Sequence, residues 1–370
     1  MFSKKNNNKT KIENKKNKIG KVSTNVINII IVAVIFVGLL IYMFAVDDME
    51  TMVHVIKNLN YNWLLIGFIC MVIYWLLESL CLYVVTKKTY KSQNFFSSLR
   101  VSMIGQLFNC ITPFSSGGQP MQAVAMVNEG KKLSNSASIL LIKFIVYQAT
   151  LVAYTLLLIV FKYSYFKSLV SNFVYLALIG FLVNFAIIIF LVSIGINKKF
   201  VYKIVSYFYK LLGKIRVLKN VDKKLEKLKT SINSFNKQFQ IIKKEKWMIT
   251  RLTIYSFIQL TVFFFVTYAV YRAFGQYGAS VINIISAQAF LMMVMAFIPI
   301  PGAGIAAEGG FLVIFNTFFE NGTINMAILT WRIYTFYLPI VVGAIFLFIN
   351  NKKSDKRINL NTQGVDLNDA

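Results

Sequence analysis

The stretch Met295-Ala-Phe-Ile-Pro-Ile-Pro-Gly-Ala-Gly-Ile-Ala-Ala-Glu-Gly-Gly310 interrupts a long apolar region with two prolines, four glycines and one carboxylate. Proline cannot continue a helix, because it lacks a backbone N–H, and glycine lets the backbone bend and approach its neighbours closely. Broken backbone at membrane depth is tolerated only where protein packs around it or a wet cavity adjoins it. We therefore predict a functional site here, with a simple helix kink as the alternative.

The composition is typical of a helical membrane protein. Of the 370 residues, 57% are hydrophobic, and several apolar runs reach about 20 residues, the length of a membrane span. The net charge is +26, but the basic residues lie between the apolar runs, where they indicate topology and contact with anionic lipid rather than nucleic acid. Cys70, Cys81 and Cys110 lack metal-ligand spacing and His54 is the only histidine, so we predict no metal site and no cofactor.

Basic segments orient the chain, because positively charged loops stay on the cytoplasmic side of a membrane. Residues 1–25 hold eight lysines and are typical of a disordered basic tail, and residues 351–370 form a polar tail, so both termini are expected in the cytoplasm. Between them we expect one transmembrane domain, residues 26–350, in two halves, 26–161 and 173–350. The predicted spans are residues 26–46, 63–86, 136–161, 173–196, 247–274 and 327–349.

The loop 197–247 carries the largest concentration of charge. Between residues 197 and 251 there are sixteen Lys or Arg against three acids, which makes this loop cytoplasmic. Its first part alternates apolar residues such as Phe200 and Leu211 with lysines at helical spacing. We predict an amphipathic helix that lies on the anionic inner leaflet.

Two units of the chain, residues 95–128 and 281–319, contain helices that are too short to span a membrane. In the first unit, predicted helices at 95–108 and 121–127 flank a Pro- and Gly-rich turn, and basic residues stand at both ends. A re-entrant hairpin that enters from the cytoplasm satisfies both features. The second unit has the same pattern but follows a span that ends outside, so it would enter from the external side.

The spacing of the two halves is also similar. Asn62 precedes Pro113 by 51 residues, and Met248 precedes Pro299 by 51 residues. The first half begins inside and the second begins outside, which defines an inverted repeat. The predicted fold is therefore an all-α polytopic membrane protein, an inverted repeat with two re-entrant broken-helix hairpins.

Carriers with such repeats bind their cargo where the broken helices meet near the membrane centre. The helices that follow Gly117–Gly118 and Gly302–Gly304 would each present free N–H groups to an anion such as a lipid phosphate. No catalytic or metal-ligating residue is predicted. The candidate substrate-binding residues are Glu78, Asn109, Pro113, Gly117, Gly118, Lys143, Pro299, Pro301, Gly302, Gly304, Glu308 and Arg332.

Four of these candidates carry charge inside predicted membrane segments. Lys143 and Arg332 would add positive charge to an anion site, and Glu78 and Glu308 would hold a cationic head group or exchange a proton. The alternative for Glu78, Lys143 and Arg332 is that each side chain snorkels to the nearest membrane edge.

Three motifs in this order resemble the membrane region of lysylphosphatidylglycerol synthases, the MprF-type flippase domain and its stand-alone relatives. They are Asn109-x-x-x-Pro113-x-x-x-Gly117-Gly118, then Pro299-x-Pro301-Gly302-x-Gly304-x-x-x-Glu308, then Arg332 followed by Tyr337-Leu-Pro339. The resemblance covers most of residues 25–350. It implies a flippase-like domain that moves aminoacylated or otherwise modified phospholipid between leaflets, with a link to cationic-peptide resistance.

Two departures from the family pattern matter. Bifunctional members carry a soluble C-terminal domain that transfers lysine to phosphatidylglycerol, whereas this chain ends about twenty residues after its last predicted span, so we expect that domain to be absent. The family often has a basic residue just after the Gly-Gly turn, where this chain has Gln119, Met121 and Gln122. The charge preference of the first hairpin is therefore left open.

The preferred interpretation is a lipid transporter of the cell membrane that moves a phospholipid, with lysylphosphatidylglycerol as a candidate. The alternative is an enzyme, phosphatidylglycerol lysyltransferase, or its accessory subunit, but no nucleophile–base pair or metal cluster stands out in the sequence. A membrane scaffold is a less favoured interpretation, because it gives no reason for the two hairpins. A channel is also less favoured, because it would need a ring of like charges, and none is visible in the sequence. The predicted partners are the phospholipid substrate and anionic inner-leaflet lipids, without nucleic acid. A homo-oligomer is left open.

Overall fold

The computed structural model describes residues 57–112, 115–163, 173–214, 221–295, 304–320 and 322–348. These ranges form helices and contain no strand. The helices are α3 (Tyr61–Thr89), α4 (Phe95–Ile111), α5 (Gly118–Asn128), α6 (Leu133–Phe161), α8 (Phe173–Ile196), α9 (Lys198–Lys214), α10 (Val221–Lys243), α11 (Lys246–Ala273), α12 (Val281–Met295), α13 (Gly304–Phe315), α14 (Ile324–Arg332) and the π-helix η3 (Ile333–Tyr337). Outside the described ranges lie the predicted first span, both tails and the candidate residues Pro113, Pro299, Pro301 and Gly302.

Five helices of the described chain are long and apolar enough to cross a membrane. They are α3, α6, the part of α8 from Leu178 to Ile196, α11, and the continuous helix Ile324–Phe348, and each lies close to a predicted span. A helix satisfies its own backbone hydrogen bonds, which is why apolar segments of this length span bilayers as helices. The all-α polytopic fold is confirmed.

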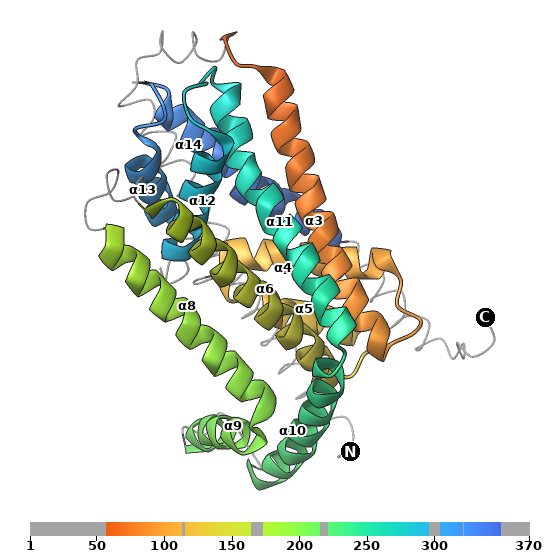
Figure 1. Ribbon diagram of the computed structural model, residues 1–370. Coiled ribbons are helices and arrows are strands. Elements are labelled where there is room, and N and C mark those ends of the chain that lie inside the picture. Colours follow the sequence, from red (N-terminus) through yellow and green to blue (C-terminus); the bar gives the residue numbers. More distant parts are fainter. Residues whose placement is uncertain are drawn as a thin grey trace, which may run out of the picture.

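Helices α3 and α11 run side by side in opposite directions along one side of the bundle, on the right in Figure 1. At one end the Asn60 N–H donates to the Ala273 carbonyl at 2.8 Å, and the Asn60 side chain caps α3. At the other end Lys88 and Glu245 form an exposed ion pair at 2.8 Å. Contacts at both ends fix the antiparallel register of one span from each half.

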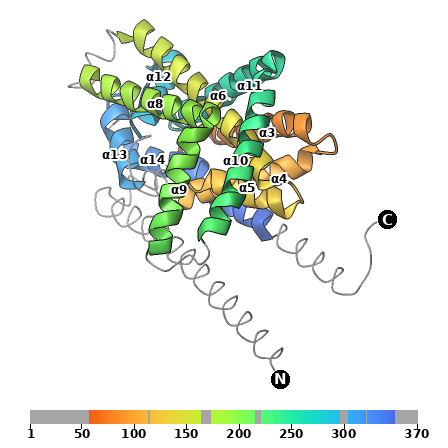
Figure 2. The ribbon, with the colours of Figure 1, turned by 90° about the horizontal axis from the view of Figure 1, so that it is seen from below.

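Helices α9 and α10 lie across one end of the bundle, where α3 and α8 end and α6 and α11 begin (Figures 1 and 2). The predicted basic amphipathic helix is present as α9, whereas α10 was not predicted. Helix α10 is tied to α6 by the Ser138 hydroxyl, which donates to the Phe235 carbonyl at 2.9 Å, and it buries Phe239 and Ile242 against the bundle. We call this the basic end, because the lysine-rich loop gathers there.

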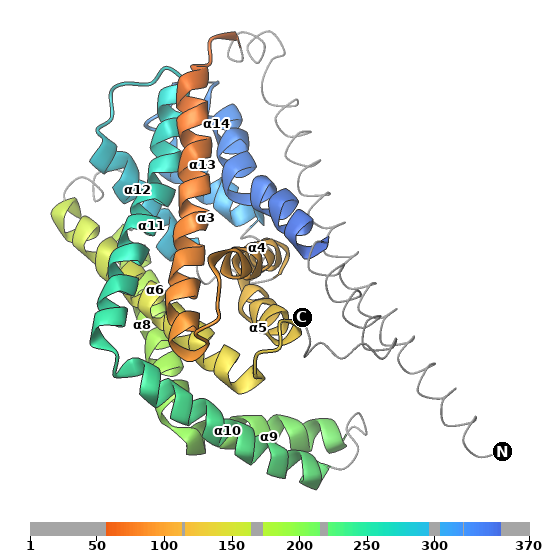
Figure 3. The same ribbon diagram turned by 90° about the vertical axis from the view of Figure 1, so that its right-hand side faces the viewer.

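Two pairs of shorter helices complete the bundle. The first short pair, α4 and α5, joins the end of α3 to the start of α6 at the basic end, and Figure 3 shows it beside α3. The second short pair, α12 and α13, joins the end of α11 to the start of α14 at the opposite end. Helices α4 and α5 begin at Phe95 and Gly118, and α12 and α13 begin at Val281 and Gly304, so the interval between the two helix starts is the same in both pairs.

Each short pair also packs against the last span of the other half. A Cβ atom at Gly343, in the last span, would lie 2.6 Å from the carbonyl oxygen of Met103 in α4, so the two backbones are in close contact. In the other half, Ala289 of α12 is in one apolar cluster with Leu151 of α6. Met103 is the ninth residue of α4 and Ala289 is the ninth residue of α12, so the same position of the first helix takes part in this packing in each short pair.

Candidate functional site

The start of α5 is closed by side chains from the end of α4. The side-chain oxygen Oδ1 of Asn109 accepts a hydrogen bond from the Gly118 N–H at 3.1 Å, and the Thr112 hydroxyl accepts one from the Gly117 N–H at 2.8 Å. Two of the N–H groups at the start of α5 are therefore already bonded within the chain, and the anion site predicted there stays a prediction. A Cβ at Gly118 would lie 2.0 Å from the Asn109 side chain, so glycine is required for this close approach. The corresponding prediction for the residues before Gly304 lies outside the described ranges.

A buried ion pair joins α3 to α6. The Lys143 amine contacts Glu78 Oε1, and the residues are only 4% and 9% exposed. The snorkelling alternative is wrong for both residues, because their charged groups meet inside the protein. Gln259 of α11 donates to the second oxygen, Glu78 Oε2, at 3.0 Å, so both carboxylate oxygens are satisfied and both halves of the chain contribute.

A second amide from the first short pair also reaches this carboxylate. Gln122 of α5 is 2% exposed, interacts with Glu78, and fills the space opposite Gly105 of α4. Gln122 is one of the three residues after the Gly-Gly turn, with Gln119 and Met121, where the resemblance led us to expect a basic residue. A cation at this position would compete with Lys143 for the same carboxylate, whereas a neutral amide adds a hydrogen bond without adding charge.

A second buried ion pair lies in the other half, between α13 and α14. Arg332 Nε lies 3.3 Å from Glu308 Oε1, and Arg332 is 3% exposed, which rules out snorkelling for Arg332 as well. The guanidinium also lies over the rings of Trp331 and Phe336, at 5.0 and 5.3 Å from their centroids. These rings hold the cation in place by cation–π attraction.

The helix changes form directly after Arg332. Residues 333–337 make a single π-helical turn, closed by the Leu338 N–H, which donates to the Ile333 carbonyl. Pro339 follows and has no N–H to offer the Thr335 carbonyl, so the regular helical pattern cannot continue through this turn. Such turns are frequent at functional sites.

The two charged sites are linked across the halves. The Cys110 thiol, near the end of α4, lies in the neighbourhood of the Arg332 guanidinium, and Gln259 of the second half binds Glu78 of the first. The structure therefore brings together Glu78 with Lys143, and Glu308 with Arg332, within one interlocked bundle. Asn109, Gly117 and Gly118 serve the internal geometry of the first short pair.

Sequence reasoning missed several polar residues that build these sites. Gln122 and Gln259 are each no more than 2% exposed, and their signal was a long polar side chain within an apolar stretch. It also gave no role to Arg100 and Glu129, which form an ion pair at the basic end of the first short pair. Arg100 is one of the basic residues at the ends of the unit 95–128, which served only to indicate topology.

Taken together, the spanning helices and the buried ion pairs define a multi-pass helical membrane protein with charged sites in its interior. Residues 28–343 match the family described as "Lysylphosphatidylglycerol synthase TM region". The match covers most of the chain, which therefore belongs to this family. A relative from Archaeoglobus fulgidus, named "UPF0104 membrane protein", is 24% identical over 311 residues, or 82% of this chain and 90% of the relative.

Proposed function

We propose that this protein moves a phospholipid between the two leaflets of the cell membrane. The observation that carries the proposal is the presence of two buried ion pairs, Glu78–Lys143 between α3 and α6, and Glu308–Arg332 between α13 and α14. Ionised groups inside membrane proteins are costly and usually mark a substrate path. Membership of a family named for a lipid-modifying synthase supports a lipid as the cargo.

The architecture we propose for this function is an inverted repeat with two re-entrant hairpins, α4–α5 and α12–α13. Three observations support it: the equal interval between helix starts in the two pairs, the attachment of the pairs at opposite ends, and the reciprocal packing against the last spans. Inverted repeats allow a carrier to open alternately to the two sides. The positive-inside rule would put the basic end, and both termini, in the cytoplasm.

In this proposal the ion pairs exchange partners with the lipid head group. A head group that carries a phosphate and an amine offers an anion to Arg332 and a cation to Glu308. Neither protein charge is then left unpaired when the lipid enters, which matters because an uncompensated buried charge costs about 3–5 kcal/mol. Lysylphosphatidylglycerol has both groups, so we propose it as the first lipid to test.

The test is leaflet-resolved lipid movement in liposomes that contain the purified full chain. Fluorescent phosphatidylglycerol and its lysyl derivative are compared for the wild type, Glu308→Gln and Arg332→Gln. Glu320→Gln is the matched control, because it makes the same change at an exposed carboxylate of the same region. We expect movement in the wild type and control, and a loss of about tenfold or more in the two site variants.

Two results would contradict the proposal. One is equal movement in the wild type, Glu308→Gln and Arg332→Gln at equal protein levels, because the second ion pair would then have no part in transport. The other is the absence of movement of either lipid by well-folded wild type.

A further inference from the structure

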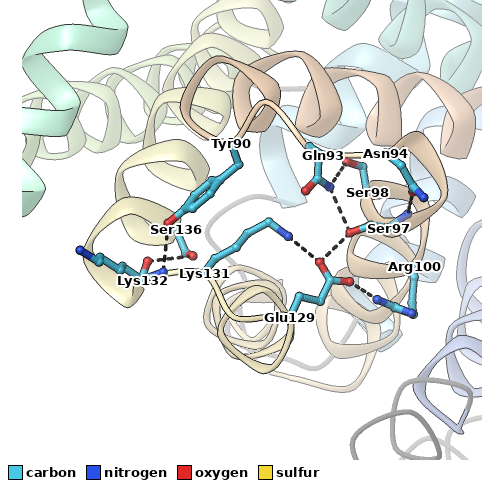
Figure 4. A network of polar contacts seen from close by, with 10 residues as sticks. All are labelled: Tyr90, Gln93, Asn94, Ser97, Ser98, Arg100, Glu129, Lys131, Lys132 and Ser136. Carbon is cyan, nitrogen blue, oxygen red and sulfur yellow. Dashed lines mark hydrogen bonds and ion pairs between the residues drawn. The ribbon is translucent and has the colours of Figure 1, made fainter. Parts of the chain in front are cut away.

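A cluster of charges outside the two interior ion pairs surrounds Glu129 at the basic end of the first short pair (Figure 4). The carboxylate follows the last turn of α5, and Arg100 of α4 pairs with its Oε1. Its Oε2 accepts from Lys131 Nζ at 2.6 Å and from the Ser97 hydroxyl at 2.5 Å. One carboxylate therefore holds the start of α4, the end of α5 and the turn into α6 together.

The cluster carries more positive charge than its carboxylate can balance. The Arg100, Glu129 and Lys131 side chains are 6%, 10% and 9% exposed, so two cations and one anion are largely withdrawn from water. Burial alone raises the pKa of Glu129, but hydrogen bonds from Lys131, Ser97 and Arg100 outweigh it and hold the pKa below its usual value of 4.5. The carboxylate is thus ionised at neutral pH, and one positive charge remains.

The hydrogen-bond donors are also in excess. Arg100 offers five N–H groups and Lys131 three, against two carboxylate oxygens. Arg100 Nε is buried and has no hydrogen-bond partner within the described ranges. A buried donor without a partner is unfavourable, and so is an unbalanced buried charge. An additional anion beside Arg100 and Lys131 would relieve both.

The surroundings favour a lipid as the source of that anion. Phe96 and Leu133, next in the chain to Ser97 and Lys132, are 54% and 62% exposed. Large exposed apolar side chains beside a charged cluster are typical of a protein surface that meets the acyl chains and head groups of a bilayer. A free phosphate ion would gain nothing from them, whereas a phospholipid would cover them with its tails.

We propose that Arg100 and Lys131 form a binding site for the phosphate of an anionic phospholipid, with its tails beside Phe96 and Leu133. Glu129 orients both cations and lowers the net positive charge of the cluster, so that the lipid binds reversibly. The site is separate from the interior ion pairs, and its occupancy does not depend on whether the protein moves lipid across the bilayer.

The test measures equilibrium binding of fluorescent phosphatidylglycerol to the purified full chain in a neutral detergent. We expect Arg100→Gln and Lys131→Gln each to weaken binding about tenfold. Lys132→Gln is the matched control, because it removes the exposed lysine next in the chain, whose contact to Tyr90 is made by the backbone N–H; it should bind as the wild type does. Glu129→Gln changes the charge in the opposite direction and should bind more tightly.

Specific outcomes would overturn the site. Unchanged binding in Lys131→Gln, or weaker binding in folded Glu129→Gln, would exclude a phosphate held by these cations, and neither result depends on whether Arg100→Gln folds. Equal binding of phosphatidylcholine would exclude selection of anionic lipid. Displacement of the lipid by an equal concentration of inorganic phosphate would show a free-anion site instead of a lipid site.

Discussion

Removing one partner of the Glu78–Lys143 pair tests whether its charges are held inside the protein. Lys143→Met keeps most of the side-chain volume but leaves the Glu78 carboxylate, 9% exposed, without its cation. An uncompensated buried charge destabilises a protein by about 3–5 kcal/mol. The hydrogen bond from Gln259 at 3.0 Å remains, so we expect the lower part of this range. Glu78→Gln leaves the Lys143 amine unbalanced and should cost a similar amount.

The double variant Glu78→Gln, Lys143→Met removes both charges and should be close to the wild type, within about 1 kcal/mol. The two single changes are therefore strongly non-additive, with a coupling free energy of at least about 3 kcal/mol. The assay is reversible unfolding in mixed micelles for the wild type, both single variants and the double variant. A second readout is pH: protonation of the unpaired carboxylate relieves its cost, so Lys143→Met should recover relative to the wild type as the pH falls.

Additive effects would refute the reasoning. If the double variant lost as much stability as the two single variants combined, the coupling free energy between the two residues would be zero. The residues would then contribute through packing and not through their ion pair. A loss below about 1 kcal/mol in both single variants would show that water reaches the charges, as it does for surface pairs.

Three further predictions concern packing, capping and pH. Gly343→Ala should destabilise the protein by about 1–3 kcal/mol in the same unfolding assay, because the new Cβ meets the backbone of α4; Gly309→Ala, where no atom lies within 4 Å of such a Cβ, is the control. Asn109→Ala should cost about 1 kcal/mol, because the Gly118 N–H at the start of α5 loses its acceptor; a neutral effect would contradict this capping role. Because folding lowers the pKa of Glu129, its contacts stabilise the protein at neutral pH and lose this effect only as the pH falls below 4.5. The difference in melting temperature between the wild type and Glu129→Gln should therefore shrink only below pH 4.5, and a difference that is constant with pH would show that the carboxylate makes no charged contact.

The sequence was sufficient to predict the spans and insufficient to predict the partners of the charges. Apolar runs of span length have one stable form in a membrane, a helix, so the span from Phe173 to Ile196 could be placed by composition alone. The partner of Glu78 is Lys143, 65 residues later, and no local pattern encodes that distance. The position of Lys143 within its span suggested that the side chain snorkels. It instead pairs with Glu78 inside the protein, and Arg332 likewise has an interior partner, Glu308, rather than reaching the membrane edge.

Helix α10 was missed for a different reason. Lysine is the commonest residue in 221–243, and a lysine-rich segment between two spans is typical of a solvated linker. Its apolar residues Ile232, Phe239 and Ile242 nevertheless share one helical face and are buried against the bundle. The contact depends on the ends of α6 and α8 meeting at the basic end, and this arrangement exists only in the folded protein.

The two short pairs have the same interval between their helix starts but different chemistry. When the pairs are aligned at their helix starts, Arg100 corresponds to Ser286 and Glu129 to Phe315, so the second pair has no counterpart of the charged cluster at these positions. Instead Phe315 stacks on Phe311 with ring centroids 4.3 Å apart. If the two halves exchange conformations during transport, a lipid at the basic end would pass a charged cluster, and a lipid at the opposite end would pass an aromatic one. Two ends that differ in this way would bind a lipid phosphate unequally, with Arg100 and Lys131 favouring it at the basic end.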